Sequence, residues 1–155
     1  MSNIKKAIEL FRDGYACSQA ILAAYCQPLG LSRERAIKIA AGFGGGMHLG
    51  GECGALTGVI MVLGLRLAPD NCDTASGRAG IYALVAEFAK RFEARNGSIL
   101  CHELLGCDIR TPEGMRQAKE RNLFKTTCVK IVEDSAMILE EMQMENQSAV
   151  DRAPC

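Results

Sequence analysis

Apolar residues recur at helical spacing along most of the chain, and no other feature of the sequence constrains the fold as strongly. In the longest such pattern Ile81, Val85 and Phe88 share one face, and Asn96-Gly97 ends it. No segment shows the sustained alternation and β-branched enrichment that predict a strand. The sequence therefore predicts an all-α fold, and residues 74–96 are expected to form a central helix.

Capping and breaking residues divide this periodicity into separate helices. Ser32 can cap one helix, and Thr111-Pro112 combines a cap with a proline at the first helical position. No internal repeat or second domain is visible. We predict a single-domain helical bundle of about seven helices over residues 1–146, with a glycine-rich loop before a central helix. Residues 147–155 lack periodicity and are expected to form a flexible C-terminal tail.

Charge and hydropathy exclude two classes of function. The 155 residues carry 18 basic and 18 acidic side chains, so no surplus of positive charge is available to bind a nucleic-acid backbone. The longest apolar run, residues 59–67, is interrupted twice and is far shorter than the roughly 20 residues that span a bilayer. The N-terminal residues lack the uninterrupted apolar core of a signal peptide. We therefore expect a cytoplasmic protein that neither binds nucleic acid nor inserts into a membrane.

Glycine is concentrated in one stretch that leads into an apolar helix from about Cys53 to Leu67. Eight of the 16 glycines lie between Gly42 and Gly58, where they would let the backbone approach another group closely. Backbone amides exposed in this way can hydrogen-bond to sulfur. The candidates for cofactor binding are Gly44, Gly45, Gly46, Gly51 and Gly54. Close helix packing through Gly54 and Gly58 is the alternative, and the phosphate-loop motif G-x-x-x-x-G-K-[ST] is absent.

Eight cysteines call for a chemical explanation in a reducing cytosol, where disulfides are rare. Four of them share a position near the start of a predicted helix: Cys17, Cys53, Cys101 and Cys128. Backbone N–H groups at a helix start favour negative charge, so a thiolate there is stabilised and its pKa falls below about 8.5. The chain has no C-x2-C pair like those of zinc ribbons and ferredoxin loops. A site shared by these cysteines must therefore be assembled by folding.

The remaining candidate ligands have weaker signals. Cys26 is expected in the core, whereas no role follows from the sequence for Cys72, Cys107 or Cys155. His102 adjoins Cys101, but neighbouring residues on a helix point about 100° apart, which makes binding of one metal by both awkward. We therefore expect His102 to be a surface residue or to support a ligand from behind.

Five segments occur in a fixed order that covers nearly the whole chain. They are Gly14-Tyr15-Ala16-Cys17-Ser18-Gln19, Gly42-Phe43-Gly44-Gly45-Gly46-Met47, Cys53-Gly54-Ala55-Leu56-Thr57-Gly58, Cys101-His102-Glu103-Leu104-Leu105-Gly106 and the late Cys128. This ordered set resembles the family of redox-active proteins named for their C-GCAxxG-C-C pattern. The resemblance implies a small redox-linked protein whose four family cysteines are Cys17, Cys53, Cys101 and Cys128. A related domain occurs in split-Soret cytochromes, but the C-x-x-C-H string for haem attachment is absent, so no haem is expected.

Three functions remain open at this point. The leading hypothesis is that Cys17, Cys53, Cys101 and Cys128 converge as thiolate ligands of an iron–sulfur cluster that transfers electrons. The alternative is a metal-free thiol–disulfide oxidoreductase or sensor, in which Cys53 is the nucleophile and Cys17, Cys101 or Cys128 resolves it. The third is a structural zinc site. The resemblance to the cytochrome domain also suggests a homodimer, and the redox partner is unknown.

Overall fold

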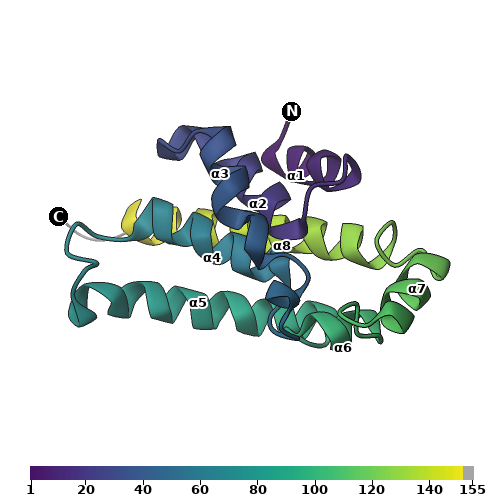
Figure 1. Cartoon of the computed structure of the whole chain (residues 1–155). Coiled ribbons are helices and arrows are strands. Elements are labelled where there is room, and N and C mark those ends of the chain that lie inside the picture. The colour runs from purple at the N-terminus through teal and green to yellow at the C-terminus, as the bar shows by residue number, and fades with distance from the viewer. Residues whose placement is uncertain (152–155) are drawn as a thin grey trace.

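A computed structural model describes residues 1–151, which form a bundle of helices (Figure 1). In chain order the helices are α1 (Asn3–Arg12), α2 (Cys17–Tyr25), α3 (Arg33–Ala40), α4 (Gly54–Leu67), α5 (Ala75–Asn96), α6 (Cys101–Leu105), α7 (Pro112–Glu120) and α8 (Thr127–Asp151). Short 3-10 turns occupy Gln27–Leu29, Ala41–Phe43 and Gly46–His48. The described residues contain one isolated antiparallel bridge and no strand. The predicted all-α fold is confirmed.

Side-chain caps explain where four of the helices begin. The first turns of α1, α3, α5 and α7 each donate a backbone N–H to a hydroxyl oxygen: those of Ser2, Ser32, Thr74 and Thr111. Such caps satisfy amides that have no partner within the helix. Helices α2, α4 and α6 have no side-chain cap, and each begins at or directly after a cysteine. The helix N-termini without a side-chain cap are therefore those next to Cys17, Cys53 and Cys101.

The core is built around α2 and α4. Helix α2 packs against α1, α3, α4 and α8, and it is buried from Ala20 to Tyr25. Figure 1 shows α5 running along one edge of the bundle, beside α4 and α8. Helix α5 buries only Gly77, Phe88 and Phe92, so the prediction that residues 74–96 form the central helix is wrong. The length of α5 makes its apolar periodicity easy to recognise in the sequence. The burial of a helix, however, depends on how many other helices surround it, and periodicity does not predict that number.

Helices α2 and α4 approach each other closely at Gly58. A Cβ atom built on Gly58 would lie 2.9 Å from Cβ of Ile21 and 3.0 Å from the carbonyl oxygen of Ser18. The Ser18 side chain is itself fully buried and donates a hydrogen bond of 2.8 Å to the carbonyl of Ala40 at the end of α3. Close helix packing, which the sequence analysis considered for the glycines, therefore occurs at Gly58.

The C-terminal helix is longer than the sequence predicts. Helix α8 continues to Asp151, past the domain boundary expected at residue 146, and the rest of the predicted tail, residues 152–155, lies outside the described residues. Within residues 1–151, none of the helices has the length and hydrophobicity that crossing a bilayer requires.

Two glycines of α4 test the importance of the close approach. We expect Gly58→Ala to lower the free energy of unfolding by about 1–3 kcal/mol, because the added methyl group has no space against α2. The matched control is Gly64→Ala in the same helix, where no atom lies within 4 Å of the added Cβ. It should raise the free energy of unfolding by up to about 1 kcal/mol through helix propensity alone. Chemical denaturation followed by circular dichroism measures both, and equal effects of the two substitutions would contradict the packing argument.

Candidate functional site

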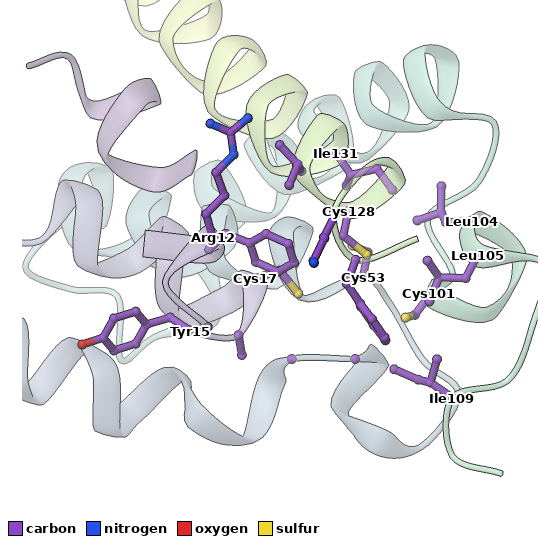
Figure 2. Close-up of a pocket in the computed structure, with 18 of the residues that line it drawn as sticks. Arg12, Tyr15, Cys17, Cys53, Cys101, Leu104, Leu105, Ile109, Cys128 and Ile131 are labelled. Atoms are coloured by element: carbon purple, nitrogen blue, oxygen red, sulfur yellow. The ribbon is translucent and has the colours of Figure 1, made fainter. Parts of the chain in front are cut away.

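Four cysteines from separate parts of the chain line one cavity of about 700 Å³ (Figure 2). Cys17 is the first residue of α2, Cys101 is the first residue of α6, and Cys128 lies in the first turn of α8. Cys53 immediately precedes α4. The structure therefore brings together the four cysteines that the sequence singled out.

The isolated bridge between Glu52 and Leu100 positions two of these cysteines. The backbone N–H of Cys53 donates to the carbonyl of Ile99 at 2.8 Å, and the N–H of Cys101 donates to the carbonyl of Gly51 at 3.1 Å. The segment before α4 is thereby tied to the segment before α6. Cys53 and Cys101 consequently lie on neighbouring backbone segments that both border the cavity.

Cys17 lies against the glycines that precede and begin α4. A Cβ atom on Gly54 would lie 2.4 Å from Sγ of Cys17, so any side chain at this position would displace the sulfur. The amide of Gly45, where φ is +63° in the left-handed region, and the amides of Ser18 and Cys17 itself lower the pKa of the Cys17 thiol. Glycine here brings a backbone amide to the sulfur and leaves room for it.

The thiols of Cys17 and Cys53 share a hydrogen bond that separates their pKa values. The hydrogen bond from Cys53 is the main reason why the pKa of Cys17 falls to about 6, and the backbone amides add to it against the opposing effect of burial. The same hydrogen bond, burial and the nearby Cys17 charge raise the pKa of Cys53 well above its usual value. Backbone amides add to the lowering of the Cys17 pKa, so Cys17 is the member of the pair that ionises more readily.

Cys101 and Cys128 are held as neutral thiols. Burial and then the charge of Cys17 raise the pKa of Cys101 to about 11 and that of Cys128 to about 12. Cys107 contributes to both shifts and packs in a small cluster with Cys101 and Leu105. No role for Cys107 was predicted from the sequence. Gly106 is the one local feature of the sequence that could have indicated the position of Cys107, because its left-handed conformation ends α6 directly before this residue.

The other predicted residues divide into two groups. Gly44 and Gly45 line the cavity, and Gly54 lies behind Cys17. Gly46 and Gly51 are instead hydrogen-bonded to each other through their backbones at 3.0 Å and shape the loop. The remaining cysteines also differ: Cys26 is fully buried in the core as predicted, Cys72 is exposed, and Cys155 lies outside the described residues.

The two histidines and two further basic residues differ in their positions relative to the cavity. His48 lines it, whereas His102 does not and is half-buried, with an Nδ1 atom that has no hydrogen-bond partner among the described residues. Arg12 and Lys125 also line the cavity. Neither residue could be predicted from the sequence, because the end of α1 and the turn before α8 carry no motif that links them to the cysteines.

The thiols suit a soft metal or an iron–sulfur cluster in chemical type. The arrangement of the thiols has to be considered separately from their chemical type. Among residues whose side chains the structure describes, no three His, Cys, Asp or Glu side chains are grouped so that they could hold one metal ion.

The ionisation of Cys17 gives a direct test of this geometry. Alkylation of Cys17 by iodoacetamide, followed by peptide mass spectrometry, should rise with pH around a midpoint of about 6, because the thiolate is the reacting form above its pKa. Cys53→Ala removes the hydrogen-bond donor and should move the midpoint up toward the ordinary thiol value of about 8.5. Cys53→Ser keeps a donor and should leave the midpoint low. A wild-type midpoint at the ordinary value would contradict the assignment of Cys17 as the thiolate.

Comparison with known proteins adds a family to this geometry. No curated protein and no solved structure matches the chain. A family model described as "Putative redox-active protein (C_GCAxxG_C_C)" matches residues 15–142, a range that contains all four cavity cysteines. The chain therefore belongs to the C_GCAxxG_C_C family of redox-active proteins.

Proposed function

We propose that this protein exchanges two electrons with a disulfide-containing substrate through the thiols of Cys17 and Cys53. The observation that carries the proposal is that both thiols lie on the wall of one cavity, where their interaction lowers the pKa of Cys17 and raises that of Cys53. A thiolate attacks a disulfide and a neighbouring thiol resolves the product, so the two states suit successive steps of one reaction.

In the first step the Cys17 thiolate attacks one sulfur of the substrate disulfide. The substrate S–S bond breaks, a bond forms between Cys17 and the attacked sulfur, and the other substrate sulfur leaves as a thiolate. Cys53 then gives its proton to that leaving thiolate and attacks Sγ of Cys17. The mixed disulfide breaks, a Cys17–Cys53 disulfide forms, and the second substrate sulfur leaves as a thiolate. The protein loses two electrons, and the substrate gains them.

The roles proposed for the pair are the reverse of those expected from the sequence, which favoured Cys53 as nucleophile. Cys17 is half-buried and lines the cavity, whereas Cys53 is only 6% exposed. A substrate sulfur in the cavity would reach Cys17 more readily. The amides around Cys17 also stabilise its thiolate, which favours attack at neutral pH.

An iron–sulfur cluster bound by Cys17, Cys53, Cys101 and Cys128 is the second candidate. It is supported by the presence of all four sulfurs on the wall of one cavity. A bound cluster would supply one-electron transfer, and the Gly45 and Ser18 amides would hydrogen-bond to its Cys17 ligand. We rank it second because the disulfide reaction needs no group beyond the two thiols. A structural zinc site ranks third, because no three described His, Cys, Asp or Glu side chains are grouped around a position for one ion.

The disulfide reaction predicts a defined product. One equivalent of oxidised glutathione added to the reduced protein should yield a Cys17–Cys53 disulfide, identified by non-reducing peptide mass spectrometry. Cys53→Ala should stop the reaction at glutathione bound to Cys17, because the resolving thiol is absent. Cys72→Ser is the control, since Cys72 is exposed and outside the cavity, and it should react as the wild type does. A wild-type product that lacks Cys17 would refute the proposed function.

A double variant separates the two leading candidates. Cys101→Ser/Cys128→Ser removes two of the four thiols but leaves the hydrogen-bonded pair in place. Disulfide exchange should persist in this variant within about threefold of the wild-type rate, because neither thiol takes part in the proposed steps. If the protein instead carries a cluster, anaerobically reconstituted wild type will contain iron and sulfide and the double variant will lose them.

The other expectations from the sequence stay predictions. A homodimer is testable by multi-angle light scattering of the reduced protein. A cytoplasmic location and an unidentified redox partner would accord with free thiols that must be reduced again after each reaction.

A further inference from the structure

The cavity beside Cys17 has the size and the surface of a small-molecule site. Its volume of about 700 Å³ lies within the roughly 300–1,000 Å³ typical of such sites. Apolar side chains from helices and from the turns between them make up most of its wall: Phe11, Leu104, Ile109, Met115, Phe124 and Ile131. Figure 2 shows Arg12, Tyr15 and Cys17 on one side of the cavity and Cys101, Leu104 and Ile109 on the other. A ligand between these sides would contact both carbon-rich surface and sulfur.

Apart from the Cys17 thiolate, the charged side chains of the cavity are basic. Arg12 and Lys125 line it together with His48, and no Asp or Glu does so among the residues described. This is a local bias, because the whole chain has 18 acidic and 18 basic residues. An apolar cavity with basic groups and no carboxylate on its wall favours a ligand that is apolar along its length and negatively charged at one end, provided that this end lies at the basic groups and away from Cys17.

Arg12 and Lys125 are both exposed, and they have no acidic partner among the described residues. In contrast, four other arginines are each paired with a carboxylate: Arg91, Arg95, Arg110 and Arg116. A ligand carboxylate at Arg12 and Lys125 would therefore displace no internal partner.

We infer that the substrate of this site is a small organic disulfide with an apolar body and an anionic group, which Arg12 and Lys125 bind while its disulfide faces Cys17. The disulfide part rests on the proposed function, in which that bond accepts two electrons from Cys17 and Cys53. The recognition of an apolar anion rests only on the cavity and its basic residues. Arg12 and Lys125 are thus specificity-determining residues that take no part in the chemistry.

Recognition is tested with a ligand that cannot react. Octanoate and the uncharged 1-octanol are titrated calorimetrically into the reduced protein. Arg12→Gln/Lys125→Gln should weaken octanoate binding on the order of tenfold and leave octanol binding unchanged, because only the carboxylate contacts are lost. The matched control Arg35→Gln/Lys119→Gln removes the same charge from exposed residues outside the cavity and should bind octanoate as the wild type does. Absence of octanoate binding, or equal binding by both double variants, overturns the inference.

A second measurement tests the substrate class separately from the thiol–disulfide chemistry of the proposed function. The rate of disulfide exchange at Cys17 is compared for an anionic reagent, 5,5′-dithiobis(2-nitrobenzoate), and a neutral one, 2,2′-dithiodipyridine. The ratio of the anionic to the neutral rate should fall on the order of tenfold in Arg12→Gln/Lys125→Gln and stay constant in the control. An unchanged ratio with normal reaction at Cys17 overturns the substrate class and leaves the proposed function intact. Failure of Cys17 to react with either reagent overturns the proposed function, while octanoate binding still decides the recognition of anions.

Discussion

The close contact between α2 and α4 is the constraint on which the rest of the structure depends. Gly58 gives the α2 backbone room beside Ser18 and Ile21, and Gly54 gives room to the sulfur of Cys17. The same approach brings Cys17 within hydrogen-bonding reach of Cys53, directly before α4. Core packing and thiol chemistry therefore use one set of glycines. A side chain at either glycine would separate the helices that the site needs in contact.

Electrostatic repulsion between thiolates then favours the ionisation of only one of the four cavity cysteines. The interaction with Cys53 and the amides around Cys17 stabilise its thiolate. The same interaction raises the pKa of Cys53, burial raises those of Cys101 and Cys128, and the Cys17 charge adds to all three shifts. Removing a second proton in a partly buried site would place like charges together with little solvent between them. The cavity thus combines one nucleophilic sulfur with several protonated ones. This distribution suits thiol–disulfide exchange without any further group.

The sequence predicted much of the local structure because the relevant signals are local. Ser32 and Thr111 cap the helices that they were expected to cap, and the all-α fold follows from periodicity that neighbouring residues share. The positions of the four cysteines at helix starts could be predicted for the same reason. Their common cavity was an expectation that depended on chain order and family resemblance, and the fold brings it about through α2, α4, α6 and α8.

The sequence by itself determined the helices, their starts and the residue types available for redox chemistry. Only the tertiary structure decided that α2 is buried more fully than the longer α5, that Cys107 joins the other thiols, and that Arg12 and Lys125 border the same cavity. It also decided which sulfur ionises. The physical reason is that burial and hydrogen bonding to sulfur act through space: Cys17 owes its low pKa to Cys53 and Gly45, which are distant in sequence and adjacent only after folding.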